Sequence, residues 1–187
     1  TFNHRREKRA APPARPSGRQ KRYRMNRRDK TNYYLDIAEA VTSRGTCLRR
    51  NYGAIIVKND EIISTGYVGA PRSRRNCSDI GVCMRERLNI PRGQRYEVCR
   101  SVHAEANAII SASRRDMLGA TLYLCGKDAR TGELVPDGEP CSMCKRMIIN
   151  AGISTVIVRN THDEYTCFDV QSDWVEEDET MNGVFDY

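Results

Sequence analysis

The sequence lacks long hydrophobic runs. Nowhere in its 187 residues is there an apolar stretch of the roughly 20 residues that a membrane-spanning helix needs. The N-terminal region also lacks the shorter apolar run that forms the core of a secretion signal. These absences argue against the membrane and secreted classes, so we expect a cytosolic protein with no membrane partner.

Each end of the chain has little charge of one sign: acids are scarce at the N-terminal end, and basic residues are absent at the C-terminal end. Residues 1–30 hold 12 Lys and Arg but only 2 acids, and residues 173–187 hold six acids and no Lys or Arg. Residues 31–187 hold 19 Lys and Arg against 22 acids, so the net charge of +7 comes from the N-terminal region. We therefore do not expect the folded part to bind nucleic acid.

The composition divides the chain into three parts. Residues 1–30 are poor in apolar residues and rich in Arg and Pro, which predicts a disordered basic extension. Residues 31–172 are long enough for one domain with a hydrophobic core. Residues 173–187 are expected to form an acidic tail or a peripheral helix. Two alternatives concern the extension: it is a nucleic-acid-binding arm, or the protein starts at Met25 and residues 1–24 are additional.

The eight cysteines do not read as a secreted disulfide framework, because two of them stand in a metal-binding context. Cys141 and Cys144 lie three residues apart after a proline, at the predicted start of a helix over residues 141–151, where they share one face. A second predicted helix, Val102–Arg115, contains no Gly or Pro. His103 lies in its first turn, and His and Cys are the side chains that bind tetrahedral zinc.

These three side chains leave one position of a tetrahedral zinc open for water, which is typical of catalytic sites. Zinc lowers the pKa of its bound water from about 16 to about 7. Glu105, in the same turn as His103, is not a ligand and is suited to carry protons. The combination of H-x-E with P-C-x-x-C is the signature of zinc deaminases. The alternative, a closed structural zinc knot, needs a fourth protein ligand and gives Glu105 no role.

The remaining pattern predicts a three-layer α/β domain with a mixed central sheet of about five strands flanked by helices. Apolar residues at helical spacing predict a first helix over Thr31–Ser43. Two strand patterns separated by Asn59-Asp60 predict a hairpin. The predicted strands are Gly53–Lys58, Glu61–Tyr67, Thr121–Cys125 and Ser154–Val158, with Cys167–Val170 as a fifth.

Over residues 31–160 the sequence resembles the cytidine and deoxycytidylate deaminase superfamily, and most closely its dCMP deaminase branch. Besides the HAE and PCSMC segments, the resemblance rests on CLRRNYGAIIVKND, IISTGYVGAP, ASRRDMLGATLYL and MIINAGISTVIV. It implies the cytidine-deaminase fold, a catalytic zinc, and hydrolysis of dCMP to dUMP and ammonia for thymidylate synthesis. It also implies a homo-oligomer, and hexamers are frequent in this branch.

The resemblance also implies substrate contacts. Tyr67 and Val68 belong to the GYVGAP loop, and Ala104 lies between the predicted ligand and the predicted acid–base residue. The family reads Asn where this chain has Val68, whose side chain cannot hydrogen-bond to a nucleotide. Arg114 follows His103 by eleven residues, which on a continuous helix is the same face, and the resembled branch has a phosphate-contacting Arg there. The alternative phosphate ligands are Arg72, Arg74 and Arg75.

Four other cysteines suggest a second zinc. In the resembled branch such a site is sometimes built from the Cys before the first strand and residues after the GYxGxP loop. Cys47 and Cys77 match these positions, and Cys83 and Cys99 lie in the segment that follows. Four thiolates form a closed structural site, which would hold residues 72–100 together. The alternative is four unrelated thiols.

Residues 126–139 interrupt the usual family pattern, in which the preceding strand runs almost directly into PCxxC. Their Gly, Pro and Asp content predicts a loop beside the active site, either a lid or a surface excursion. Cys125 and Cys167 match no metal pattern, and we expect both to be small buried residues.

Other functions fit parts of the pattern. Within the enzymes they are a free-nucleoside cytidine deaminase, a tRNA adenosine deaminase and a deaminase of another amino-heterocycle. A free nucleoside needs no phosphate-binding Arg114, and tRNA needs a basic folded surface. A different class is a DNA-associated zinc protein that uses the basic extension, against which an intact Glu105 argues.

Overall fold

The structure is a computed structural model that describes residues 27–91 and 93–178. Most of the predicted basic extension, residues 1–26, and the last part of the predicted acidic tail, residues 179–187, lie outside the described residues. Within the described ranges, none of the helices is both long and apolar enough to cross a membrane.

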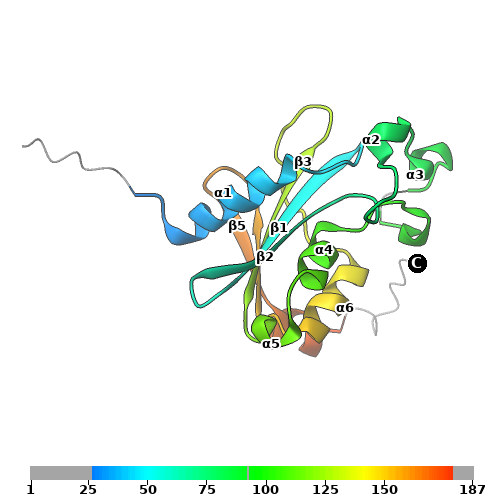
Figure 1. Cartoon of the computed structure of the whole chain (residues 1–187). Helices are drawn as coiled ribbons and strands as arrows, with labels where there is room; N and C mark the ends of the chain where they lie inside the picture. Colours follow the sequence, from blue (N-terminus) through cyan, green and yellow to red (C-terminus); the bar gives the residue numbers. More distant parts are fainter. Residues whose placement is uncertain (1–26, 92, 179–187) are drawn as a thin grey trace, which may run out of the picture.

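Five strands form one mixed sheet in the order β2-β1-β3-β4-β5 (Figure 1). Strands β3 and β4 are parallel, and the other neighbouring pairs are antiparallel. The predicted hairpin is present, with Asn59 and Asp60 both at positive φ, as in a type I′ turn. The strands are β1 (Arg50–Lys58), β2 (Glu61–Tyr67), β3 (Thr121–Asp128), β4 (Thr155–Arg159) and β5 (Tyr165–Asp169).

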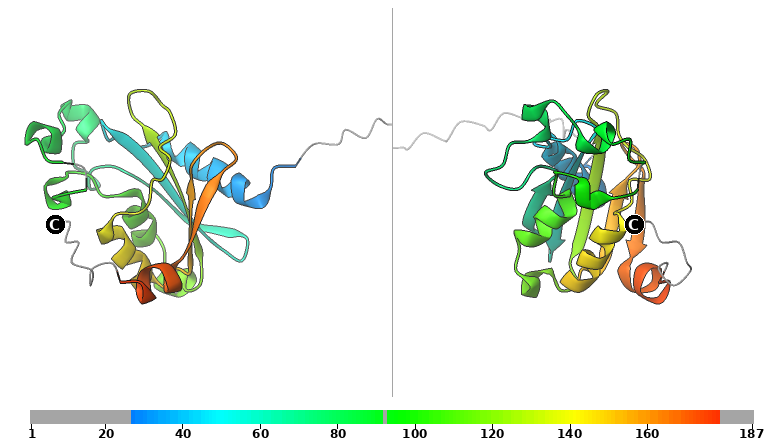
Figure 2. Two further views of the ribbon diagram at one scale, coloured as in Figure 1. Left: turned by 180° about the vertical axis from the view of Figure 1, so that it is seen from behind. Right: turned by 90° about the vertical axis from the view of Figure 1, so that its right-hand side faces the viewer.

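Helices cover both faces of the sheet, which confirms the predicted three-layer architecture (Figures 1 and 2). Helix α1 (Lys30–Thr42) lies on one face, and α4 (Ala104–Ile110) and α6 (Ser142–Ala151) lie side by side on the other. The short α2 and α3 lie beyond the end of the sheet where β1 begins (Figure 1). The short helices are α2 (Cys77–Ile80), α3 (Met84–Arg87), the 3-10 helix η1 (Tyr96–Val98), α5 (Arg114–Met117) and the π-helix η2 (Gln171–Glu176).

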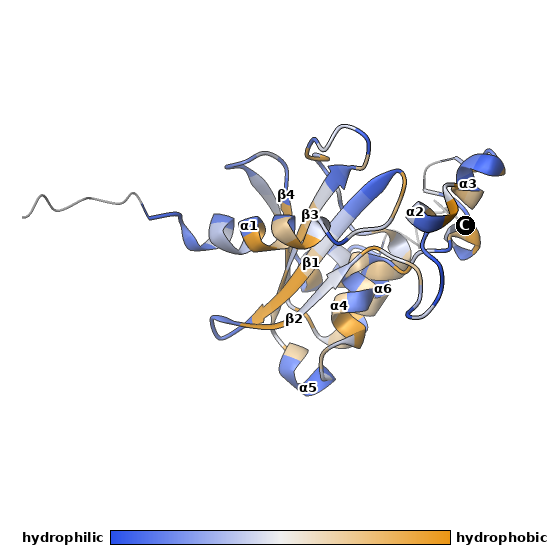
Figure 3. Ribbon diagram, turned by 45° about the horizontal axis from the view of Figure 1, so that its top comes forward, coloured by the Kyte–Doolittle hydropathy of each residue, from blue (hydrophilic) through white to orange (hydrophobic). Residues whose placement is uncertain are grey.

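Alternate residues of the central strands face opposite helical layers. Ile55 of β1 packs with Leu35 of α1, whereas Ile56 packs with Ile148 of α6, and all four are fully buried. Neighbouring residues of a strand point to opposite faces of the sheet, so a strand buried on both faces is continuously apolar. Figure 3 shows this hydrophobic stretch of β1 and the polar turn that joins it to β2.

The helix predicted over residues 102–115 is wrong in its extent. Helix α4 ends before Ser111, and a separate short helix, α5, begins after Ser113. The Ser111 hydroxyl donates a hydrogen bond to the carbonyl oxygen of Asn107 at 2.8 Å, and serines that bond to the local backbone compete with helix continuation. His103 is the N-cap of α4 and lies before its first turn.

The structure describes the start of the predicted C-terminal segment, and it corrects one expectation about a cysteine. The described part of the 173–187 segment continues η2, and Trp174 is only 8% exposed. Its ring packs against Phe168 of β5, with the centroids 5.6 Å apart. Residues 173–176 are therefore helical and pack on β5, which fits the peripheral-helix alternative. Cys167, which we expected to be buried, is exposed on β5, whereas Cys125 is fully buried.

Candidate active site

Three metal-ligating side chains converge where helices α4 and α6 begin. His103 is the N-cap of α4, Cys141 is the N-cap of α6, and Cys144 lies in the first turn of α6. The His103 Nδ1 atom is 3.4 Å from Cys141 Sγ and 3.5 Å from Cys144 Sγ. Their ligand atoms all lie within 4.8 Å of one another, and residues 27–91 and 93–178 contain no other such group.

These distances fit a tetrahedral zinc. With Zn–N of about 2.0–2.1 Å and Zn–S of about 2.3 Å, the edge of a tetrahedron that joins N to S is about 3.6 Å long. The two edges in the structure, 3.4 and 3.5 Å, match this length. Among the described residues no fourth side chain completes the set, so the residues fit a zinc with one position left for water.

The ionisation of the two thiols favours metal binding. A hydrogen bond from the Cys144 thiol and the neighbouring His103 lower the pKa of Cys141, which favours its thiolate form. The same hydrogen bond, together with burial, raises the pKa of Cys144. A cation that binds here displaces the proton that the two sulfur atoms share.

Glu105 lies in the first turn of α4 beside this group, and only 5% of it is exposed. Burial raises the pKa of its carboxyl group, although the nearby charge of His103 opposes the shift. A carboxyl group with a raised pKa exchanges protons closer to neutral pH, as a general acid and base requires. Glu105 is not part of the ligand group, so its position suits proton transfer.

A cavity of about 160 Å³ opens beside these residues and is bordered by His103, Glu105 and Cys141. Two of the predicted substrate residues, Val68 and Ala104, line it. The cavity therefore contains the predicted metal ligands, the predicted proton carrier and part of the predicted substrate contacts in one place.

Tyr67, the third residue that we predicted in this part of the site, does not line the cavity. It is 38% exposed, and the guanidinium of Arg44 lies 6.0 Å from the centroid of its ring. Its carbonyl oxygen accepts a hydrogen bond of 2.7 Å from the side-chain amide of Asn107 on α4. Asn107 thus joins the end of β2 to the helix that carries Glu105.

Arg114 is not in the cavity either. The break after α4 places it at the start of α5, where its Nε donates to the carbonyl oxygen of Asn150 at 3.0 Å. Asn150 lies at the C-terminal end of α6, separated from Cys141 by about 13 Å of helix rise. The prediction that Arg114 shares the face of His103 is therefore wrong. The alternative phosphate ligands are exposed and also lie outside the cavity lining: Arg72, Arg74 and Arg75.

Three arginines that the motif analysis does not single out line the cavity: Arg49, Arg50 and Arg85. Arg49 and Arg50 belong to the CLRRNYG segment at the start of β1, so the resemblance contains a signal for them. Arg85 lies in the segment of residues 72–100, where no motif points to it. The cavity is thus lined by three cations in addition to the acids Glu105 and Glu139.

The inserted segment 126–139 packs against the same cavity. Strand β3 extends into it, and Val135, 8% exposed, donates its backbone N–H to the carbonyl oxygen of Gly126 at 2.9 Å. A Cβ atom on Gly126 would lie 2.5 Å from the ring of Tyr52, which lines the cavity. Glu139 at the end of the segment is also a lining residue. The segment therefore forms part of the cavity wall.

The four cysteines of the predicted second zinc site lie at or near the same cavity. Cys47, Cys83 and Cys99 line it, and Cys77 is buried close to them. Burial raises the pKa of Cys77 and Cys99, and the charges of neighbouring thiols add to the shift. No three of the four sulfur atoms lie within 4.8 Å of one another, so the structure brings these residues into one region without closing a metal site.

Comparison with known proteins bears on this arrangement. The family model of the cytidine and deoxycytidylate deaminase zinc-binding region matches residues 28–160. The deoxycytidylate deaminase of Mycobacterium phage D29 is 37% identical over 139 residues, which cover 71% of this chain and 96% of the phage protein. The deoxycytidylate deaminase of Saccharomyces cerevisiae is 33% identical over 158 residues, which cover 83% of this chain but only 42% of the yeast protein. The solved apo structure of dCMP deaminase from cyanophage S-TIM5 is 27% identical, with a TM-score of 0.49 and coverage of 70% of this chain and 82% of that one.

Proposed function

The chain belongs to the cytidine and deoxycytidylate deaminase family, and we propose that it is a zinc-dependent hydrolase that converts dCMP to dUMP and ammonia. The observation that carries this proposal is the triangle of His103, Cys141 and Cys144 beside the buried Glu105. The arginines around the cavity support a substrate that carries negative charge. The matching phage relative, which this chain covers almost entirely, supports dCMP.

Each site residue has a proposed role. A zinc ion held by His103, Cys141 and Cys144 would supply an activated water at its fourth position. Glu105 accepts one proton from the water and delivers it to the ring nitrogen N3 of cytosine as the water oxygen bonds to C4. It then takes the second proton from the new C4 hydroxyl group and passes it to the amino group, so that the C4–N bond breaks, ammonia leaves and the C4 carbonyl of dUMP remains. Its burial supports this role, because a raised pKa lets the same carboxyl group both accept and donate a proton. Val68 and Ala104 border the space for the base.

We further propose a second, structural zinc bound by Cys47, Cys77, Cys83 and Cys99. Their common location next to the cavity supports this site. Residues 72–100 hold only short helical turns, so a metal that cross-links them contributes to the folding of this segment.

We also propose that the domain, described here from residue 27 to 178, assembles as a homo-oligomer. Several large apolar side chains are exposed on the layer that contains α4, α5, α6 and η2, which supports a surface covered by another subunit. They are Ile110, Leu118, Met143 and Val175. Sedimentation velocity tests this proposal: a monomer at micromolar concentration contradicts it, and a hexamer is the form expected from the family resemblance.

Ammonia release from zinc-loaded protein tests the proposed reaction. The substrates are dCMP, CMP, deoxycytidine, dCTP and adenosine, compared at equal concentration. We expect the highest kcat/KM for dCMP and none for adenosine. A preference for deoxycytidine would indicate a nucleoside deaminase, and activity on adenosine alone would contradict the assignment to cytosine substrates.

A further inference from the structure

Arg85 is a buried cation in the cavity wall. It lies on α3, is 7% exposed and lines the cavity together with Arg49 and Arg50. The neighbouring acid Glu86 forms its ion pairs with Arg49 and Arg130, each at 3.5 Å. Among residues 27–91 and 93–178 no carboxylate lies within ion-pair distance of Arg85. Its charge acts at longer range on Glu97, whose ion pair is with Arg95 at 3.0 Å.

The orientation of the Arg85 side chain is fixed by its surroundings. Its Nη2 donates to the carbonyl oxygens of Pro91 at 2.7 Å and Gln94 at 2.6 Å. Its guanidinium lies over the ring of Tyr96, 4.5 Å from the centroid. The ring of Tyr96 in turn meets the ring of His103 edge to face, with the centroids 5.1 Å apart. Arg85 is therefore held one aromatic ring away from a metal ligand.

Part of the donor capacity of Arg85 is unused. Its Nε–H is buried and has no hydrogen-bond partner among the described residues. Leaving a buried donor unsatisfied is unfavourable, and leaving a buried charge unpaired is more so. The cavity wall thus holds a positive charge that an anionic ligand in the cavity would compensate.

We propose that Arg85 binds the phosphate of the nucleotide substrate, an inference that rests on the proposed function. Nη2 of Arg85 is used by the carbonyl oxygens of Pro91 and Gln94, whereas Nη1 is not among the buried atoms and has no partner among the described residues, so its N–H groups are the donors that can reach a phosphate oxygen in the cavity. Arg49 and Arg50 add positive charge to the same cavity. The separation of Arg85 from His103 by one ring is on the scale of the sugar that joins base and phosphate, so a base can reach the metal ligands while its phosphate meets Arg85.

A second role for Arg85 must be separated from this one. Its charge also acts on Cys99, where it opposes the rise in pKa that burial of the thiol causes. If the four cysteines bind zinc as thiolates, Arg85 could compensate their negative charge instead of binding substrate. Its hydrogen bonds to the carbonyl oxygens of Pro91 and Gln94 also stabilise this loop, which is a purely structural role.

The test compares Arg85→Gln with Arg87→Gln in zinc-loaded protein. Arg87 lies on the same helix, is exposed and does not line the cavity, so it is a matched control. We expect Arg85→Gln to lower kcat/KM for dCMP by about 10- to 100-fold, the loss of a charge-assisted contact. Calorimetry should show a similar loss of affinity for dUMP. Deoxycytidine turnover, deoxyuridine affinity and zinc content should stay at the values of Arg87→Gln.

Equal losses for dCMP and deoxycytidine would overturn the proposal and assign Arg85 to the structure of the loop. Loss of one zinc would overturn it in favour of charge compensation. If Arg85→Gln does not fold, Arg85→Lys decides, because it keeps the charge but loses the guanidinium donors: an unchanged ratio of dCMP to deoxycytidine turnover refutes the proposal. A wild-type protein that acts on neither substrate refutes the proposed function, and the binding of dUMP against deoxyuridine still tests Arg85.

Discussion

A Cβ atom on Gly66 would lie well inside contact distance of the carbonyl oxygen of Ala104 and the amide nitrogen of Ala108. Strand β2 and helix α4 therefore meet backbone to backbone at the turn that carries Glu105. Only glycine permits this approach, because the opposing atoms are backbone atoms that cannot move aside without shifting the helix. Gly66 thus fixes the position of the active-site helix on the sheet.

Gly66→Ala should lower the free energy of unfolding by about 1–3 kcal/mol, the usual cost of overpacking, and should lower zinc retention because α4 is displaced. Urea denaturation and metal analysis measure both effects. Ser64→Ala is the control on the same strand: Ser64 is 9% exposed, and its hydroxyl has no partner among the described residues. Removing that hydroxyl should leave stability unchanged or raise it. Wild-type stability in Gly66→Ala would contradict the close contact.

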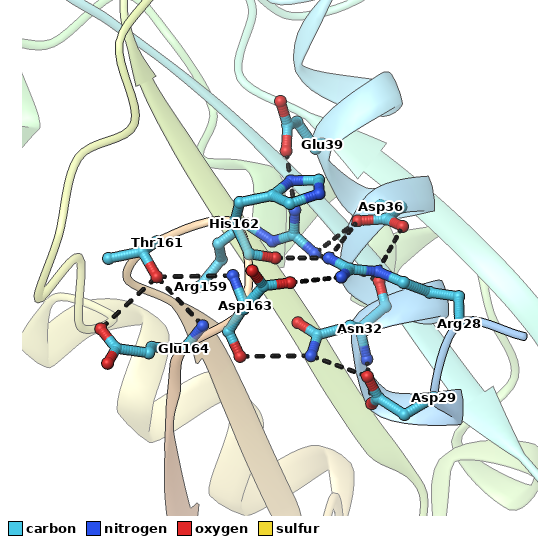
Figure 4. A network of polar contacts seen from close by, with 10 residues as sticks. All are labelled: Arg28, Asp29, Asn32, Asp36, Glu39, Arg159, Thr161, His162, Asp163 and Glu164. Carbon is cyan, nitrogen blue, oxygen red and sulfur yellow. Dashed lines mark hydrogen bonds and ion pairs between the residues drawn. The ribbon is translucent and has the colours of Figure 1, made fainter. Parts of the chain in front are cut away.

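A fully buried arginine links helix α1 to strand β4 (Figure 4). Arg159 at the end of β4 donates from Nη1 to Glu39 at 2.9 Å and from Nη2 to Asp36 at 2.6 Å. Removing both negative charges leaves the Arg159 charge buried without an ion pair, so Asp36→Asn combined with Glu39→Gln should lower the free energy of unfolding by about 3–5 kcal/mol. Glu61→Gln, an exposed change on β2, is the control. A double variant as stable as this control would show that the network does not stabilise the fold.

The same network predicts how stability depends on pH. Burial alone would raise the pKa of Asp36 and Glu39, but hydrogen bonds from Arg28 and Arg159 to Asp36, and from Lys127 to Glu39, lower both pKa values. Groups with a lowered pKa in the folded state stabilise it above the ordinary carboxyl pKa of about 4, and this contribution is lost as the pH falls further. Stability should therefore drop between about pH 5 and pH 3. Arg159→Met should show a smaller drop in parallel denaturation curves; an equal drop would exclude these carboxyl groups as its source.

The number of zinc ions bound per chain tests the proposed second zinc site. We expect two zinc ions per chain in zinc-supplied protein, and Cys77→Ser should lower the count by one and destabilise the fold. Cys167→Ser, a change of an exposed cysteine on β5, should leave the count at two. A count of one in the wild-type protein would refute the second site.

The three metal ligands and the strands of the sheet can be predicted from the sequence, because each depends on a local pattern of residues. The ligands His103, Cys141 and Cys144 carry their spacing in short motifs, and a strand buried on both faces, such as β1, reads as an apolar run. Arg114 shows the limit of this reasoning. Its predicted position requires an unbroken helix, but α4 ends at Ser111 and the separate helix α5 begins after Ser113.

Arg85 shows a different limit. Its burial depends on the path of a segment without periodicity and on a stack with Tyr96, which no sequence spacing encodes. In the same way, the sequence marks Gly66 as part of a strand but does not show that α4 crosses it there. Contacts of this kind arise from tertiary packing, so the pattern of single segments cannot predict them.

Turnover of dCMP by zinc-replete Glu105→Ala protein tests the central claim most directly. Removing this carboxyl group takes away the proposed proton carrier without removing any of the ligands His103, Cys141 and Cys144. We predict that the variant retains its catalytic zinc and loses turnover by at least about a hundredfold, the lower range for general acid–base catalysis. A variant that holds zinc and still deaminates dCMP at a near-normal rate would contradict the account.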